Sequence, residues 1–205
     1  MAEVTSAPQN PAWLQLIVGL GNPGSKYDQT RHNAGQEFLL ALACQHGLGL
    51  ILEKRYNGLY GRISVQGHPL HLLVPTTYMN LSGQAIQALM KFYRLSTSSV
   101  LVVHDELDLP AGVARFKYGG GHGGHNGLRD IISKLGGQRD FYRLRLGIGH
   151  PGNSRDVLSY VLKRAPASQR IRSQKAMDEA LLHLPYAVFG DWQQAMHRLH
   201  SAAID

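Results

Sequence analysis

The stretch LIVGLGNPG, from Leu16 to Gly24, joins an apolar run to a cluster of turn-forming residues. An apolar run of this length that stops at glycine, asparagine and proline is typical of a buried strand followed by a tight turn. The pattern returns at Val100–Val103, where a second apolar run leads into a polar stretch from His104 to Asp108. The sequence therefore predicts buried strands with polar residues at their C-terminal ends.

Helical patterns separate these strands. Apolar residues at helical spacing predict helices at about His32–His46, Ser82–Arg94 and Asn126–Leu135, with Ser82 and Asn126 as N-caps. Further strands are predicted at Leu59–Val65, Leu70–Val74, Val113–Tyr118 and Tyr142–Ile148, and helices beyond Ser154. Interleaved elements of both kinds favour an α/β fold. We expect a twisted, mixed, mostly parallel sheet with helices on both faces and a helical C-terminus.

Length and composition favour a single domain. A chain of 205 residues with 43% hydrophobic content can bury one substantial core, so we expect one domain at 13–205 behind a disordered tail at 1–12. No apolar run approaches the roughly 18 residues of a membrane-spanning helix, and no secretory signal pattern is present, which predicts a cytoplasmic protein. The single cysteine, Cys44, falls in an apolar helical pattern and is predicted to be a small buried residue.

Basic charge is concentrated in one part of the chain. The whole sequence carries 21 Lys and Arg against 14 Asp and Glu, a net charge of +7. Residues 110–175 hold 13 basic and 3 acidic residues, a net of +10, and the rest holds 8 and 11, a net of −3. This distribution suits a polyanionic partner such as a nucleic acid, although on composition alone a solvated surface is an equal alternative.

The glycines of the first stretch match a familiar cofactor motif only in part. Gly19, Gly21 and Gly24 satisfy the dinucleotide pattern G-x-G-x-x-G after a strand. That pattern also requires a helix that opens at the glycines and an acidic residue about 20 positions later for the ribose. Here Pro23 continues a turn, and residues 40–46 contain no acid. Dinucleotide binding is therefore disfavoured.

Metal and serine-nucleophile chemistry are disfavoured as well. His122 and His125 are metal-ligand types, but they lie in a glycine-rich segment that is too flexible to fix a coordination polyhedron without further anchors. The nucleophile motif G-x-S-x-G does not occur. We therefore expect no metal and no cofactor, and chemistry by an activated water.

Five polar segments, taken in order, resemble the bacterial-type peptidyl-tRNA hydrolase family. They read GLGNPG at 19–24, TRHNAG at 30–35, PTTYMNLSG at 75–83, HDELD at 104–108 and GGGHGGHN at 119–126. Each segment alone is a weak signal, whereas all five in this order are highly specific. The resemblance runs from about Gln15 to Leu162 and more loosely through the C-terminal helices. The chain before Trp13 and after about Trp192 has no clear match.

The resemblance implies hydrolysis of the ester between a peptide and the 3′ ribose of peptidyl-tRNA, which releases both and recycles tRNA during translation. It implies a cytoplasmic monomer that needs no cofactor. His32 matches the general base, Asp105 its orienting partner and Asn22 a further catalytic position. A helix N-terminus favours neutral His32 whereas a nearby Asp105 favours its protonated form, so the sequence leaves the direction of the pKa shift open.

The resemblance also supplies residues for the substrate. Those that match substrate-binding positions are Tyr27, Tyr78, Met79, Asn80 and Asn126. Lys117 and Arg145 match tRNA phosphate contacts and give the basic stretch a specific partner. Phosphate contacts predict binding that weakens steeply with salt.

Several of these residues also have a simpler structural interpretation. His32 is consistent with a solvent-facing helix residue and Asp105 with a strand-end carboxylate. The three asparagines suit a turn, a loop and a helix cap. The rival function is a non-catalytic RNA-binding protein on the same fold, which would be marked by loss of the histidine or the aspartate; both are present. Residues 149–161 are a candidate mobile cover of the site.

Overall fold

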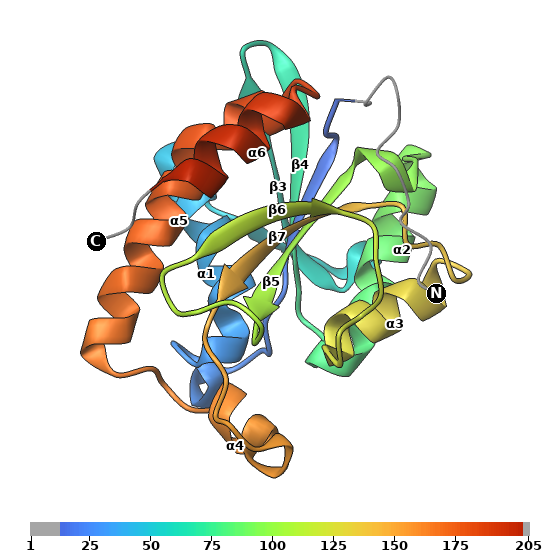
Figure 1. Ribbon diagram of the computed structural model, residues 1–205. Helices are drawn as coiled ribbons and strands as arrows, with labels where there is room; N and C mark the ends of the chain where they lie inside the picture. Colours follow the sequence, from blue (N-terminus) through green and yellow to red (C-terminus); the bar gives the residue numbers. More distant parts are fainter. Residues whose placement is uncertain (1–12, 203–205) are drawn as a thin grey trace.

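A seven-stranded sheet organises the computed structural model, which describes residues 13–202 (Figure 1). The strands are β1 (Leu16–Gly19), β2 (Ile51–Glu53), β3 (Gly58–Val65), β4 (His68–Pro75), β5 (Val100–Glu106), β6 (Ala114–Tyr118) and β7 (Tyr142–Gly147). Their order is β2-β3-β4-β1-β5-β7-β6. The pairs β4–β1, β1–β5 and β5–β7 are parallel, and the outer pairs are antiparallel. The expected mixed sheet is confirmed, with its parallel part at the centre. The tail expected at 1–12 lies outside the described residues.

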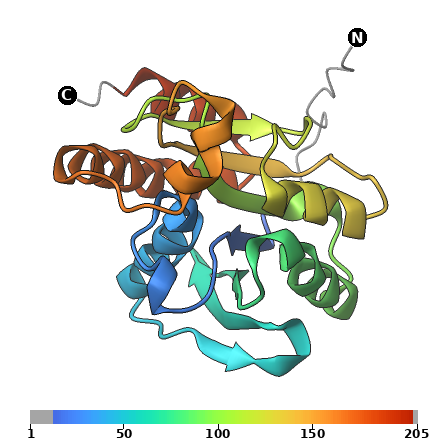
Figure 2. The same ribbon diagram turned by 90° about the horizontal axis from the view of Figure 1, so that it is seen from below.

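Helices cover both faces of the sheet, as expected. They are α1 (Ala34–Gln45), α2 (Ser82–Tyr93), α3 (Asn126–Lys134), α4 (Val157–Val161), α5 (Ala167–Val188) and α6 (Trp192–Ser201). Helices α1, α5 and α6 pack on one face, and α2 and α3 pack on the other (Figure 2). The short helix α4 lies at the edge toward which β5 and β7 point (Figure 1). None of the helices in the described part of the chain has the length and apolar content that a bilayer span requires.

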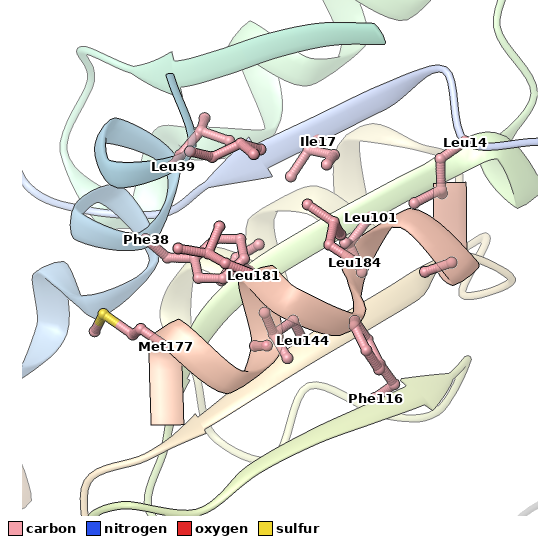
Figure 3. Packing of buried hydrophobic residues seen from close by; sticks show 14 of the residues in the cluster. Leu14, Ile17, Phe38, Leu39, Leu101, Phe116, Leu144, Met177, Leu181 and Leu184 are labelled. Carbon is pink, nitrogen blue, oxygen red and sulfur yellow. The ribbon is translucent and has the colours of Figure 1, made fainter. Parts of the chain in front are cut away.

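The strand β1 is buried on both sides, which explains its continuous apolar sequence. Ile17 belongs to the core under α1 and α5, whereas Leu16 and Val18 belong to the core under α2 and α3. In the first core, side chains from α1, α5 and the sheet interdigitate (Figure 3). Each fully buried Leu or Phe contributes roughly 1.5–3 kcal/mol relative to an exposed one. These two cores hold the central strands, and with them the site, in place.

Two glycines allow α1 to approach the sheet backbone closely. A Cβ atom at Gly35 would lie 2.2 Å from the Val103 carbonyl oxygen, and one at Gly19 would lie 2.4 Å from the Gly35 carbonyl oxygen. Only glycine fits at such a contact. The first turn of α1 therefore rests directly on β1 and β5. Since His32 immediately precedes this turn, the close contact brings it to the carboxyl end of β5.

The structure corrects several local predictions. Ser82 is not a side-chain cap, because its hydroxyl donates to the Met79 carbonyl at 2.8 Å. Cys44 is exposed and not buried, because it lies one helical turn after the exposed Leu40 on the outer face of α1. The short edge strand β2 was not predicted. Its Ile51 and Leu52 are both exposed, so it lacks the alternation that marks a half-buried strand.

Candidate active site

Asp105 is the centre of a buried polar cluster at the end of β5. His32 Nδ1 lies 2.9 Å from Asp105 Oδ1 and 3.0 Å from Oδ2, and His125 Nε2 lies 2.9 Å from Oδ1. The aspartate is only 4% exposed. A carboxylate at this depth remains ionised only where donors replace its water. We therefore assign a proton to each of these two imidazole nitrogens, and both rings donate to Asp105.

The tautomer of His125 is also fixed from its other side. Its Nδ1 accepts the backbone N–H of Gly127 at 3.1 Å and of Leu128 at 3.3 Å, in the first turn of α3. Nδ1 therefore carries no proton, which agrees with a proton on Nε2. The prediction that Asn126 caps α3 is wrong: the cap is the His125 side chain, and the Asn126 side-chain oxygen accepts from Arg129 Nη1 at 2.7 Å.

His32 retains one free ring nitrogen. Because Nδ1–H is held by Asp105, the neutral ring has its lone pair on Nε2. Burial lowers the pKa of His32, but the charge of Asp105 and the hydrogen bond to it outweigh burial and raise that pKa above its ordinary value of 6.5. This decides the question that the sequence left open. A neutral imidazole held in one tautomer, with its lone pair free, can take a proton from water.

The surroundings of Asp105 and His104 also fix the charge states of these two groups. Burial raises the pKa of Asp105, but the two facing histidines more than reverse this and hold it well below its usual range. His104, on the neighbouring position of β5, donates from Nδ1 to the Asp105 carbonyl oxygen at 2.7 Å. Burial lowers the pKa of His104 to about 3, so this ring is neutral. Asp105 is thus an anion fixed through both its side chain and its main chain.

A cavity of about 410 Å³ opens beside this cluster. Its walls come from His32, the end of β5, the glycine-rich segment 122–126 and the short helix α4. Val157, Leu158 and Val161 form the apolar side contributed by α4. The cavity therefore combines a free imidazole nitrogen with an apolar wall.

Asn22 lies in a second network beside His32. Its side-chain oxygen accepts the Met79 N–H at 2.8 Å. Asn33 holds the Asn22 backbone at both polar atoms, accepting its N–H at 2.8 Å and donating to its carbonyl oxygen at 3.0 Å. The Asn22 oxygen is therefore occupied, and its Nδ2 hydrogens remain available to an incoming acceptor.

Comparison with known proteins identifies the family. The family model for peptidyl-tRNA hydrolase matches residues 16–205. The chain belongs to the peptidyl-tRNA hydrolase family. It is 58% identical over 188 residues to the peptidyl-tRNA hydrolase of Pseudomonas paraeruginosa, covering 92% of this chain and 97% of that protein. The crystal structure of peptidyl-tRNA hydrolase from Acinetobacter baumannii superposes with a TM-score of 0.91 at 46% identity, covering 94% of this chain and 97% of that one. The family and fold predicted from the sequence are confirmed.

The fold of this peptidyl-tRNA hydrolase family member divides the predicted substrate residues between two places. Asn126 lines the cavity with His32 and Asp105. Tyr27 and Tyr78 are not among the residues that line this cavity; their ring centroids lie 6.4 Å apart, and Tyr78 is 57% exposed. Met79 is buried and contributes its backbone N–H to Asn22, and Asn80 is exposed.

The predicted phosphate contacts lie on neighbouring strands. Lys117 of β6 is exposed, and its Nζ lies 3.2 Å from the position of a Cβ at Gly120. Arg145 of β7 donates from Nε to Glu106 Oε2 at 2.8 Å. That ion pair gives Glu106 a partner that the sequence did not suggest. Lys117 therefore lies beside the glycine-rich segment, and Arg145 pairs with a residue that lines the cavity.

Three side chains of the cluster have the types and spacing of metal ligands. Ligand atoms of His32, Asp105 and His125 lie within 4.8 Å of one another. A metal would replace the proton on His125 Nε2, although the ring's other nitrogen is already occupied as an acceptor for α3. Deprotonation there would require an anionic ring or the loss of the helix cap. The arrangement of these three side chains therefore suits two hydrogen bonds to Asp105 better than a bound metal ion.

Two functional neighbours were missed by sequence reasoning. His125 was considered only as a metal ligand, and Asn33 was given no role. The only sequence signal for His125 is its position immediately before a helix, where a side-chain acceptor is favoured. For Asn33 no signal exists, because its partner Asn22 is 11 residues away across a turn.

Proposed function

We propose that this chain hydrolyses the ester bond of peptidyl-tRNA with a water activated by His32. The observation that carries the proposal is the buried Asp105–His32 pair, which leaves a free Nε2 beside a cavity in a member of this family. Met79, Asn80, Asn126 and the two tyrosines Tyr27 and Tyr78 are the proposed substrate contacts.

In the proposed reaction His32 first takes a proton from water and later returns it to the leaving group. Nε2 takes a proton from water as the oxygen adds to the ester carbonyl carbon, and a tetrahedral intermediate forms. Asp105 stabilises the resulting imidazolium, because it already holds Nδ1–H. The C–O bond to the ribose then breaks, and the proton passes from His32 to the 3′ oxygen. The products are a free peptide carboxyl group and a tRNA hydroxyl group.

Asn22 is the proposed donor to the substrate carbonyl. Met79 N–H occupies its oxygen and Asn33 fixes its backbone, so the Nδ2 group is oriented before substrate arrives. A donor that is oriented in advance stabilises a developing oxyanion without reorganisation. The same amide suits the carbonyl of a blocked amino group, which is how it would favour peptidyl-tRNA over free aminoacyl-tRNA.

Lys117 and Arg145 are the proposed phosphate contacts. Lys117 is exposed, and Arg145 keeps its two terminal nitrogens while Nε binds Glu106. The net charge of +10 over residues 110–175 supports tRNA as the partner. Cytoplasmic location and a monomeric state, with no membrane partner, follow from the family resemblance and belong to this proposal.

The helix α4 is the proposed cover of the site. It places three apolar residues against the cavity, and Leu158 among them is 66% exposed. Arg31 anchors the C-terminal end of α4, since its guanidinium lies 4.0 Å from the Tyr160 ring centroid and donates to the Tyr160 carbonyl oxygen at 3.2 Å. An exposed apolar wall held at one end suits a segment that closes over substrate.

The experiment compares N-acetyl-aminoacyl-tRNA with free aminoacyl-tRNA as substrates of the wild-type chain and of His32→Ala. We expect the wild type to cleave only the blocked substrate. The variant should bind tRNA normally and lose about 100- to 10,000-fold in kcat, since general base catalysis is removed. A wild-type chain that binds tRNA and cleaves neither substrate would support the non-catalytic RNA-binding alternative and overturn the proposal.

A further inference from the structure

The glycine-rich segment has very little side chain by which it could be held. Residues 119–124 contain five glycines, of which Gly119, Gly120, Gly123 and Gly124 have positive φ. Such a segment has large conformational freedom in isolation. It nevertheless delivers the His125 ring to within 2.9 Å of Asp105. A restraint from outside the segment is therefore needed.

That restraint comes from Arg143, on β7. One terminal nitrogen of its guanidinium donates to the Gly121 carbonyl oxygen and the other to the Gly120 carbonyl oxygen. The guanidinium carbon lies 4.8 Å from the centroid of the Phe141 ring, which supports it from one side. Gly119 N–H also donates to the Phe141 carbonyl oxygen at 3.0 Å. Three consecutive residues of the segment are thus fixed to β7 and to the residue just before it.

The burial of Arg143 indicates that its charged side chain is kept for the contact with the Gly120 and Gly121 carbonyl oxygens. The residue is 3% exposed, and no carboxylate within residues 13–202 forms an ion pair with it. Burial and the neighbouring Arg145 lower its pKa to about 10, but it remains charged at neutral pH. Burying a cation without a counter-ion is costly, and the two carbonyl oxygens are what offsets that cost. An apolar residue would fill the space without orienting the segment.

We infer that Arg143 is a positioning residue for the reaction, because its clamp on Gly120 and Gly121 sets the contact between His125 and Asp105. The inference rests on the proposed esterase activity. Its chain of contacts runs from Arg143 through the two glycine carbonyls to His125, then to Asp105 and His32. The planar fork of arginine reaches both carbonyls at once, which a lysine ammonium cannot do.

The consequence for His32 has a definite sign. His125 donates one of the hydrogen bonds that stabilise the Asp105 carboxylate. If the segment moves away, that carboxylate loses a donor and attracts the His32 proton more strongly. Neutral His104 bonds only the Asp105 main chain and does not replace the lost donor. Loosening the clamp should therefore raise the pKa of His32.

Arg143→Lys is the test, and Arg115→Lys is its matched control. Arg115 lies on the adjacent strand β6 and also bonds two carbonyl oxygens, of Leu199 at 3.5 Å and His200 at 2.9 Å, but these belong to α6. We expect Arg143→Lys to lower kcat about 10- to 100-fold through misplacement of the cluster, with little change in affinity for deacylated tRNA. The acid limb of its pH–rate profile should move to higher pH. Arg115→Lys should leave the limb and kcat per folded molecule unchanged, whatever its Tm.

A double-mutant cycle shows whether the effect passes through His125. If it does, Arg143→Lys should have almost no further effect on kcat in a His125→Asn background, so the two losses are not additive. Hydrogen exchange of the 119–126 amides should be faster in Arg143→Lys than in the control. The inference is overturned if kcat per folded molecule and the acid limb are unchanged in Arg143→Lys, or if the two losses add. An inactive wild type would instead refute the proposed function itself.

Discussion

The cluster around Asp105 and the cationic edge of the site differ in how completely the protein fixes them. At Asp105 three imidazole rings each donate one hydrogen bond to this residue, and the carboxylate is almost fully buried. At the edge, Lys117 is exposed, and Arg145 is held by a single ion pair. Chemistry depends on geometry at the scale of tenths of an ångström, whereas a phosphate repeats along any tRNA and is bound by charge. Changes at Asp105 should therefore lower kcat, and changes at the edge should raise KM.

The largest expected effect comes from Asp105→Asn. An amide is uncharged and carries an NH2 donor in place of one carboxylate oxygen, so His32 loses its counter-charge and a carboxylate that fixes its tautomer. We expect kcat to fall about 10,000-fold, as when an orienting aspartate is replaced in a triad. Single-turnover hydrolysis of N-acetyl-aminoacyl-tRNA measures this. A loss below tenfold would show that the buried cluster is not the reacting centre.

Asn22→Asp should have the next largest effect. The variant keeps an oxygen to accept the Met79 N–H but loses the Nδ2 donor. Loss of one oxyanion donor costs about 100- to 1,000-fold in kcat. Asn33→Asp is the control, because it disturbs only the bonds to the Asn22 backbone. If both variants lose activity equally, Asn22 acts through loop structure and not as a donor.

The pH dependence of kcat/KM tests whether His32 is the base. Only neutral His32 can act as a base, and Asp105 raises its pKa above 6.5. The value of kcat/KM should therefore fall as pH decreases through a pKa above 6.5. In Asp105→Asn only burial shifts the pKa of His32, and burial lowers it. The acid limb of the residual activity should therefore move to lower pH. A limb that is identical in the two proteins would assign the ionisation to another group.

The smallest effect is expected at the edge. Lys117→Gln removes one phosphate contact, so the slope of log affinity against log salt should decrease by about 1, and KM should rise with kcat unchanged. Lys91→Gln, on the exposed surface of α2, is the matched charge control. Equal changes in both variants would indicate a general charge effect without a defined tRNA contact.

The sequence predicted the parts of the site that lie on regular elements. His32 and Asp105 were assigned because they match the family's motifs, and the apolar pattern placed one before a helix and the other at the end of a buried strand. His125 was not found, since its role depends on where a glycine-rich segment returns to β5, and glycine patterns do not specify a path. The same limit explains why Asn126 was wrongly predicted as the cap of α3. The choice between the adjacent His125 and Asn126 depends on which side chain also reaches Asp105.

The parallel pairing of β1 with β5 has a consequence for biosynthesis. Leu16 pairs with Val100, and His32 must find Asp105 across 73 residues of chain. Contacts of such long range form late and slow the folding of parallel sheets. While the chain is being made, β1 has no partner β5, and the glycine-rich segment has no β7 on which to rest. An enzyme proposed to rescue tRNA from abandoned translation thus acquires its own active site only after most of its message has been read.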